Sequence, residues 1–505
     1  MFIRNILLVF LVLKITSANY SAGPFAKWTV QNAWKHPECA TEIQKVLSPD
    51  LEEEECDTKK FYAAVIDGGS TGTRLHLFKF KHNPEIEHSM FELKKETFKE
   101  LKPGLSSFCD NPEMAAENIR HLIMLAKKAV PKELWKHTPV TVKATAGLRL
   151  LPDDKAETIL YHVQDEVDES GLLVGEESVG MLSEIDEGVF AWFTVNYLTN
   201  QLRHVALNAN KATIAALDLG GGSTQVTFAP QYPVEAFSMV GESEFSHTIN
   251  IFGIPVKLYT HSYLGNGLIA ARLGIAQLTT QGNDSNTRKL TTHCLPADFL
   301  LDDWDYSGHI WIVTGTQNSS FEDCLASAKE YVVDIKNVRE VPELQVHDVY
   351  VFSYFYDRGV QANIIRNSHE QKGGWATVGD YKLAAERACS LPAEAIGPEH
   401  WQPWQCLDLT YIYSLLHYGY GMPDDKEIHL TKKINGMETS WALGAAYHML
   451  SHYHTTPHTP AVTNETPADY YEGQNDTTQP GIITQMVTYI SDRATDVLSI
   501  FKMVS

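Results

Sequence analysis

The sequence predicts an α/β protein built from two related halves, and three observations support that prediction. Runs rich in β-branched and aromatic residues alternate along the chain with segments whose apolar residues recur at helical spacing. One acidic, glycine-rich turn, DGGSTGT beginning at Asp67, returns as DLGGGSTQ beginning at Asp218. At 505 residues the chain is longer than a single hydrophobic core usually serves, so we expect two or more domains.

The N-terminus has the pattern of a secretory signal peptide. Arg4 precedes an apolar run from Ile6 to Leu13, and small residues follow up to Ala18. The run is shorter than the roughly 20 apolar residues of a membrane-spanning helix, so cleavage of residues 1–18 is favoured over a retained anchor. No later segment approaches spanning length. Residues 19–60 are polar and acidic and predict a solvated lead-in.

The first half is expected to open with a strand hairpin, because FYAAVI and RLHLFKF flank the turn at Asp67. AAENIRHLIMLAKKAV and DDKAETILYHVQDEV have apolar residues at helical spacing. Between them, PVTVKATAGLRLLP predicts a strand that ends in a turn at Thr145. MLSEIDEGVFAWFTVNYL then predicts a helix with Glu187 near its beginning.

The second half repeats this plan from ATIAALDLGGGSTQVTF onward. The helix-like LGNGLIAARLGIAQL is followed by a looser region and then by VYVFSYFYDRG and CLDLTYIYSLLHYGYG. SWALGAAYHML, residues 440–450, predicts a helix of small residues that can approach another backbone closely. Residues 454–505 predict a low-complexity tail whose terminal helix packs onto the protein rather than onto a membrane, because its polar face is not basic.

The charge balance limits the partners. A formal charge of −22 makes long-range attraction to nucleic acid or to anionic lipid unlikely as a basis for function. A polyanionic substrate would have to be captured locally, by backbone N–H groups or by a bound cation.

The cysteines and sequons fit an oxidising compartment. Disulfides are the default there, and proximity in the sequence suggests the pairs Cys294–Cys324 and Cys389–Cys406. Seven cysteines leave at least one thiol without an internal partner, and the fate of Cys39, Cys56 and Cys109 stays open. Sequons for N-glycosylation stand at Asn283, Asn318, Asn464 and Asn475.

The doubled turn suits phosphate binding. Glycines let backbone N–H groups face a phosphate without an intervening Cβ, and neighbouring hydroxyls add donors. If the two halves face one another, Asp67 and Asp218 converge, and a hard dication such as Mg²⁺ or Ca²⁺ would offset their repulsion. The alternative is that each aspartate only caps its own turn. The candidate phosphate-binding residues of the two turns are Gly69, Ser70, Thr71, Gly72, Gly221, Gly222 and Ser223.

Hydrolysis of a phosphate also needs a carboxylate that orients and deprotonates water. Glu187 is the candidate, although Glu184 and Asp186 are near it and spacing alone does not choose among the three. Thr145 could donate a hydroxyl to phosphate or could simply end its strand. His448 and His452 stand at i,i+4 without an evident third metal ligand, so we interpret them as solvated, and His76 as structural.

Five segments resemble, in order, the apyrase-conserved regions of the GDA1/CD39 family of ectonucleoside triphosphate diphosphohydrolases. They are DGGSTGTRLHLFKF, KATAGLRLLP, EIDEGVFAWFTVNYL, LDLGGGSTQVTF and ETSWALGAAYHML. The resemblance implies two ribonuclease-H-like domains of the actin, Hsp70 and sugar-kinase superfamily, facing across a cleft. Domain I would comprise residues 61–183 with 432–453, and domain II residues 184–431.

By the same resemblance Glu187 is the catalytic base, and Asp67 and Asp218 hold Ca²⁺ or Mg²⁺ through water. Thr145 and Gln225 match residues that position phosphate, water or metal. Aromatic rings stack on the base in this family, which makes Tyr411 the better match and Tyr356 a weaker one. Packing of both tyrosines in the core is an equal alternative.

STGTRLHLF, KPGLSSF, YTHSYLGNGL and SYFYDRG resemble the soluble branch of the family. That branch implies a lumenal or secreted nucleoside diphosphatase that favours UDP and GDP and clears them after glycosyl transfer, in the endoplasmic reticulum, the Golgi or outside the cell. FKMVS is not a retrieval signal of the KDEL type. A broader apyrase that accepts triphosphates, a kinase of the same superfamily and an inactive nucleotide-binding chaperone remain alternatives, and the oligomeric state stays open.

Overall fold

The computed structural model describes residues 59–82, 90–202, 213–238, 242–251, 254–280, 288–297, 299–306, 308–317, 319–369 and 373–455. All of these belong to one compact unit, which ends at Thr456. The predicted signal peptide, nearly all of the lead-in and the tail from residue 456 lie outside the described residues. So do the four sequon asparagines and two cysteines, Asn283, Asn318, Asn464, Asn475, Cys39 and Cys56.

The first of two large sheets has five strands in the order β3-β2-β1-β4-β5. Its strands are β1 (Lys59–Gly68), β2 (Thr73–His82), β3 (Glu92–Leu101), β4 (Val140–Ala144) and β5 (Val179–Met181). The first three are antiparallel neighbours, while β4 runs parallel to β1 and β5 parallel to β4.

The second large sheet has eight strands in the order β14-β15-β16-β13-β6-β7-β9-β8. Its strands are β6 (Ala215–Leu219), β7 (Ser223–Phe228), β8 (Ser246–Ile251), β9 (Ile254–Leu264), β13 (Val349–Ser353), β14 (Arg366–His369), β15 (Gly373–Thr377) and β16 (Glu427–Leu430). Its middle, β9-β7-β6-β13-β16, repeats the first sheet: three antiparallel strands and then two parallel ones. The predicted duplication is therefore visible as a repeated strand order, that of a ribonuclease-H-like unit.

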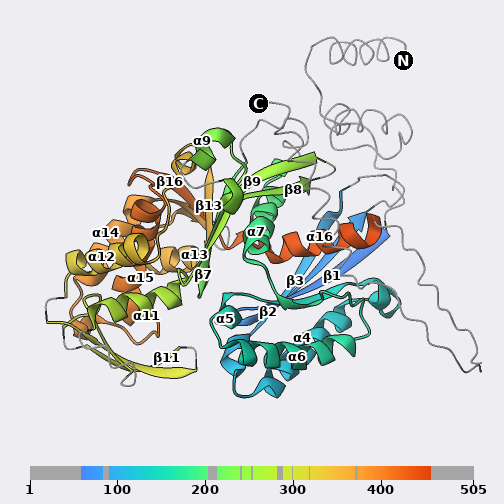
Figure 1. Ribbon diagram of the computed structural model, residues 1–505, viewed down its shortest axis with the longest axis horizontal. Helices are drawn as coiled ribbons and strands as arrows, with labels where there is room; N and C mark the ends of the chain where they lie inside the picture. The colour runs from blue at the N-terminus through green and yellow to red at the C-terminus, as the bar shows by residue number, and fades with distance from the viewer. Residues whose placement is uncertain are drawn as a thin grey trace, which may run out of the picture. The chain divides into compact units, whose positions relative to one another are not determined.

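Helices cover both sheets in layers (Figure 1). Helices α4 (Pro112–Ala129) and α6 (Asp153–Asp168) lie on the outer face of the first sheet, and the four-residue α5 (Ala146–Arg149) follows β4. The outer face of the second sheet carries α11 (Leu268–Thr279), α12 (Phe321–Lys329), α13 (Tyr354–Gln361), α14 (Val378–Cys389) and α15 (Gln405–Ser414). Two short helices, α9 (Pro233–Ser238) and α10 (Glu242–Phe245), lie between β7 and β8 in the chain.

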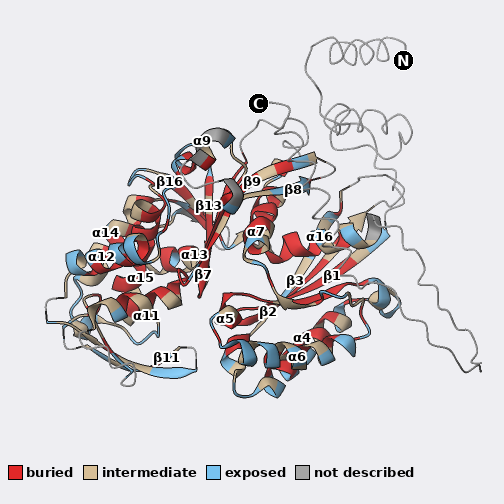
Figure 2. Ribbon diagram, viewed as in Figure 1, coloured by how far each residue is buried: buried red, intermediate tan, exposed pale blue. Residues whose placement is uncertain are grey.

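Two helices fill the space between the inner faces of the sheets. Helix α7 (Glu184–Leu198) packs on β6, β7 and β9, and α16 (Ala442–Thr455) packs on β1 and on α7. Glycines permit this close approach, because a Cβ at Gly444 would lie 2.5 Å from the carbonyl oxygen of Phe190. The central strands β1, β2, β4, β6 and β7 and helix α7 are mostly buried (Figure 2).

We call the first sheet with α4, α5, α6 and α16 the first lobe, and the second sheet with its helices, including α7, the second lobe. Helix α16 is the last described element of the chain, yet it packs on β1, the first. The predicted boundaries of domains I and II stay a prediction. Among the described residues, no helix combines the length and the apolar character that crossing a membrane requires.

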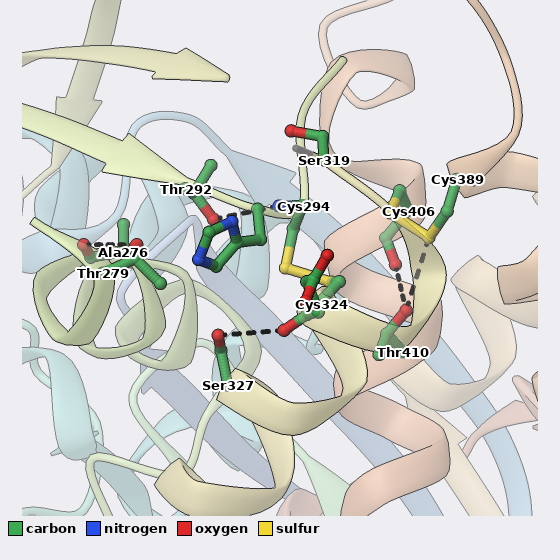
Figure 3. Close-up of a disulfide and its surroundings, with 12 residues drawn as sticks. Ala276, Thr279, Thr292, Cys294, Ser319, Cys324, Ser327, Cys389, Cys406 and Thr410 are labelled. Carbon is green, nitrogen blue, oxygen red and sulfur yellow. Dashed lines mark hydrogen bonds between the residues drawn. A yellow bond between two sulfur atoms is a disulfide. The ribbon is translucent and has the colours of Figure 1, made fainter. Parts of the chain in front are cut away.

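Both disulfides that the sequence predicts are present. Cys294–Cys324 joins the strand region near β10 (Lys289–Thr292) to α12, and Cys389–Cys406 joins α14 to α15 (Figure 3). Strand β10 belongs to a small sheet with β11 (Leu300–Tyr306) and β12 (His309–Gly315). Cys109 carries a free thiol and is partly exposed. A two-stranded hairpin, β17 (Lys433–Ile434) and β18 (Met437–Glu438), precedes α16.

Candidate active site

The two predicted turns are hairpin turns of the same register. The first connects β1 to β2, and Asp67 pairs across the hairpin with Arg74. The second connects β6 to β7, and Asp218 pairs with Gln225. In each case the partner stands seven positions after the aspartate. The repeated sequence therefore gives the two aspartates equivalent places, each near the end of the central strand of its sheet.

The two turns meet at the boundary between the lobes. A Cβ at Gly221 would lie 2.3 Å from Ser70 Oγ and 3.6 Å from Thr71 Cγ2. A Cβ at Gly222 would lie 2.9 Å from the Cβ of Ala146 in α5. A side chain at position 222 would crowd Ala146, whereas one at position 221 would require the Ser70 hydroxyl to rotate away.

Several backbone donors of the turns have no acceptor among the described residues. Gly69 donates its N–H to the carbonyl oxygen of Gly72, which closes the first turn. The N–H groups of the three following residues, Ser70, Thr71 and Gly72, and those of Gly221 and Gly222, find no such partner within the described chain. Because Ser70, Thr71 and Gly221 are also partly exposed, these amides can reach an anion.

Glu187 lies in the first turn of α7, next to the meeting point of the hairpins. Ser183 caps the helix by accepting a hydrogen bond from the N–H of Asp186. The glycine that follows Glu187 sets its position, since a Cβ at Gly188 would lie 2.6 Å from Thr227 Oγ1. The absent side chain lets the start of α7 rest directly on β7, and Glu187 is only 7% exposed.

The pKa of Glu187 is raised to about 7: burial raises it most, Arg149 lowers it, and the negative charges of Asp218 and Asp67 raise it. Arg149 Nη2 donates to Glu187 Oε2 at 2.8 Å and to the carbonyl oxygen of Leu182 at 3.0 Å. The arginine, in α5, therefore fixes the carboxylate from the other lobe. A glutamate with a pKa near neutrality is suited to exchange a proton with water.

Burial likewise raises the pKa of Asp218 to about 6 and raises the pKa of Asp67. Each aspartate also raises the pKa of Glu187, so the three carboxyl groups lie close enough to act on one another electrostatically. Arg74 compensates in part: its Nη1 lies 3.3 Å from Asp67 Oδ2, and its Nε donates to Glu100 at 2.9 Å. The side chain of Ser353, a residue with φ of 58°, lowers the pKa of Asp218 and so opposes the effect of burial.

These residues fit a divalent cation. Asp67 Oδ1 and Asp218 Oδ1 are buried, and neither has a hydrogen-bond partner in the described part of the chain. A buried carboxylate oxygen without a partner is costly, and a cation or its bound water would satisfy it. Carboxylate oxygens are also the ligands that Ca²⁺ and Mg²⁺ prefer.

The remaining predicted phosphate contacts lie around the two turns. Thr145 lies between β4 and α5, and its backbone nitrogen donates to the carbonyl oxygen of Gly68 at 3.4 Å. Gln225 is buried, and its Nε2 donates to Ser223 Oγ and to Ser262 Oγ, both at 2.9 Å. Gln225 therefore holds Ser223 in place at the start of β7.

The two predicted base-binding tyrosines have different surroundings. Tyr411 is completely buried in α15, and its hydroxyl donates to the carbonyl oxygen of Asn266 at 2.5 Å. Its base-stacking role stays a prediction and would require the ring to become exposed. Tyr356 is partly exposed on α13, just after the strand that ends beside Asp218.

Sequence reasoning missed Arg149, Arg74, Ser353 and Ser262. Arg149 had a detectable signal, since it stands four residues after Thr145 and so follows it by about one helical turn. Arg74 and Ser262 pair with Asp67 and Gln225 across strands, which becomes evident only when the register is known.

A model described as the GDA1/CD39 (nucleoside phosphatase) family matches residues 53–464, most of the chain. The chain belongs to this family. All five conserved segments fall within the match, and the chain is an enzyme of the nucleoside phosphatase class.

Curated members of the GDA1/CD39 family are similar over most of their length. The nucleoside-diphosphatase uda-1 of Caenorhabditis elegans is 43% identical over 408 residues, which cover 79% of this chain and 84% of that protein. The human nucleoside diphosphate phosphatase ENTPD5 is 40% identical over 393 residues, which cover 77% and 87%.

A solved structure supports the fold. The nucleoside triphosphate hydrolase of Neospora caninum superposes with a TM-score of 0.56 at 14% identity, covering 84% of this chain and 97% of that one. At this identity the likeness concerns the fold alone. It agrees with the two ribonuclease-H-like sheets described above.

Proposed function

We propose that this protein hydrolyses the terminal phosphate of nucleoside diphosphates, with UDP and GDP favoured, to give the monophosphate and inorganic phosphate. The observation that carries the proposal is the convergence of Glu187, Asp67 and Asp218 where the two glycine turns meet. The printed names of the uda-1 and ENTPD5 relatives, both diphosphatases, support the same substrate class.

The free amides of Ser70, Thr71, Gly221 and Gly222 would bind the oxygens of the terminal phosphate. Asp67 and Asp218 would hold Ca²⁺ or Mg²⁺ through water, and the cation would neutralise charge on the phosphate oxygens. Tyr356 and, once exposed, Tyr411 would contact the base.

Glu187 in its ionised form would accept a proton from the attacking water, while Arg149 keeps its carboxylate in place. The turn amides, which are fixed before the reaction begins, would stabilise charge on the phosphate in the transition state. Thr145 and Gln225 would keep the phosphate and the second turn in position.

The second candidate is a broader apyrase that also accepts triphosphates. Its support is that another relative, at 38% identity over 435 residues, is the ectonucleoside triphosphate diphosphohydrolase 6 of Mus musculus. Phosphate release from UDP, GDP, ADP, UTP and ATP, each with Ca²⁺ or Mg²⁺, separates the two. The diphosphatase proposal fails if triphosphates are hydrolysed as fast as diphosphates.

We also propose a site of action in the lumen of the endoplasmic reticulum or Golgi, or outside the cell, where the enzyme would clear UDP and GDP left by glycosyl transfer. The signal-peptide pattern of residues 1–18 and the two disulfides support an oxidising compartment. Fractionation of cells that express the full chain would test it, and a cytosolic pool with intact activity would contradict it.

A further inference from the structure

We propose that two equivalent glycine–leucine pairs, Gly104–Leu105 in the first lobe and Gly267–Leu268 in the second, are positioning elements that aim the amides of the phosphate turns. The inference deepens the proposed function and rests on phosphate binding by those turns. Neither pair belongs to the turns themselves, and each lies behind one of them.

In the first lobe the N–H of Leu105 donates to the carbonyl oxygen of Gly69 at 3.1 Å. A Cβ at Gly104 would lie 2.4 Å from that same oxygen and 2.5 Å from the carbonyl carbon of Ser70. Only glycine leaves room for the backbone of residue 104 to press against the turn.

The second lobe repeats this contact. The N–H of Leu268 donates to the carbonyl oxygen of Gly220 at 2.9 Å. A Cβ at Gly267 would lie 2.3 Å from the carbonyl carbon of Gly221 and from the nitrogen of Gly222.

The two contacts occupy the same place in the duplicated unit. The accepting carbonyls, at Gly69 and Gly220, each stand two residues after the aspartate of their turn. Each pair follows the third strand of its repeat, β3 or β9, and each leucine begins a helix: a short 3₁₀ segment at Leu105 and α11 at Leu268.

The physical effect follows from the planar trans peptide, in which the carbonyl of one residue and the N–H of the next point in opposite directions. When Leu105 binds Gly69 O from behind, the N–H of Ser70 is turned toward the front. Leu268 does the same for the N–H of Gly221. Two further amides of α11, those of Ile269 and Ala270, bind Gly221 O at 3.0 Å, which turns the N–H of Gly222 forward.

These contacts also remove carbonyl oxygens from the face where phosphate would bind, so a phosphate would meet donors rather than lone pairs. The arrangement explains why the amides of Ser70, Gly221 and Gly222 have no acceptor among the described residues. In the second lobe a further layer supports it: Gly265 N–H donates to Gly222 O, and Tyr331 Oη donates to Gly265 O, both at 2.7 Å.

The test uses the Gly104→Ala and Gly267→Ala variants of the full chain. For each we would measure the KM and kcat for UDP, and the dissociation constant of inorganic phosphate by calorimetry. We expect the phosphate dissociation constant and the KM to rise at least about tenfold, because the added methyl group displaces the turn and its amides.

The matched control is Gly374→Ala in β15, where a Cβ would lie 2.3 Å from the carbonyl oxygen of Arg366 but touches neither turn. It should lower the melting temperature as much as the test variants while leaving phosphate affinity unchanged. Phosphate affinity at the wild-type value in Gly104→Ala and Gly267→Ala, or an equal loss in Gly374→Ala, would overturn the inference.

A milder variant covers the case in which Gly267→Ala does not fold. Tyr331→Phe removes only the hydrogen bond to Gly265 and should weaken phosphate binding about threefold or more. Tyr197→Phe, which removes the hydrogen bonds that its hydroxyl donates to Phe91 O and accepts from Leu93 N–H, should not. Equal phosphate affinity in both would overturn the inference for the second lobe. Absence of UDP hydrolysis by the wild type would refute the proposed function instead. The role of the two glycine–leucine pairs would still be tested by the phosphate affinities, which do not depend on hydrolysis.

Discussion

At the scale of single residues, Glu187 combines burial, two neighbouring negative charges and one opposing guanidinium. We expect Glu187→Gln to lower kcat for UDP by about 10²–10⁴, because an amide cannot accept the proton of water. Binding of a non-hydrolysable UDP analogue should be retained. The matched control is Glu157→Gln, an exposed residue of α6 on the outer face of the first sheet, which should change kcat by less than about threefold. Equal losses in both variants would contradict the role of Glu187.

The dependence of kcat/KM on pH should report the ionisation of Glu187. Since burial raises the pKa of Glu187 to about 7, and only the ionised form accepts a proton, kcat/KM should rise with pH and level off above about 7. The measurement is the initial rate with limiting UDP between pH 5.5 and pH 8.5, roughly 1.5 units on either side of that pKa. A profile that is flat across this interval would show that another group is the base.

We expect Arg149 to determine the pH at the midpoint of that profile. Its charge lowers the pKa of Glu187, so Arg149→Met should move the midpoint to higher pH and lower kcat by about 10², because the carboxylate also loses its anchor. Arg120→Met, which breaks an ion pair with Glu166 on the surface, is the matched control and should leave the midpoint unchanged. Identical midpoints in all three proteins would refute this positioning role.

At the scale of elements, the contact between α7 and α16 joins the two lobes through glycine. Gly444→Ala places a methyl group 2.5 Å from Phe190 O, so we expect a loss of about 1–3 kcal/mol in the free energy of unfolding. Urea denaturation would measure it. Gly180→Ala is the control, because its Cβ would come no closer than 3.9 Å to another residue, and it should unfold within about 0.5 kcal/mol of the wild type. A Gly444→Ala protein as stable as this control would show that the helices can separate without cost.

Many of the secondary-structure elements and both disulfides are predictable from the sequence. The hairpins around Asp67 and Asp218, the helix that begins near Glu187 and both disulfides follow from local patterns, and the structure contains each of them. Contacts across strands and between lobes do not follow, because alternation in one strand says nothing about which residue of the next strand stands opposite. The partners Arg74 and Arg149 are of that kind.

Tyr411 shows that resemblance to a family segment does not reveal whether a side chain is buried. CLDLTYIY matched a segment with an aromatic ring on the base, but nothing local in it indicates whether Tyr411 is buried. Its burial depends on α15 being enclosed, and Asp408 of the same helix binds Arg272 and Arg358 of α11 and α13. Such tertiary ion pairs between distant segments leave no periodic signal in a single sequence.

At the scale of the whole molecule, the proposed cation site would draw its two aspartates from both lobes. Chelation with EDTA should abolish UDP hydrolysis, because Asp67 and Asp218 come from different lobes and would repel one another without a cation between them. Adding Ca²⁺ or Mg²⁺ should restore the rate. Full activity in excess EDTA, after dialysis against metal-free buffer, would exclude this use of the aspartates.

The duplicated strand order puts the two turns in equivalent positions. The residues opposite the aspartates differ, however: Arg74 in one repeat and Gln225 in the other. Glu187 also comes from one lobe only, at the start of α7. Two identical turns would bind a pyrophosphate equally well in either of its two orientations. Because Arg74 stands in one repeat, Gln225 in the other and the candidate base beside only one of them, we expect the protein to hold its substrate in a single orientation.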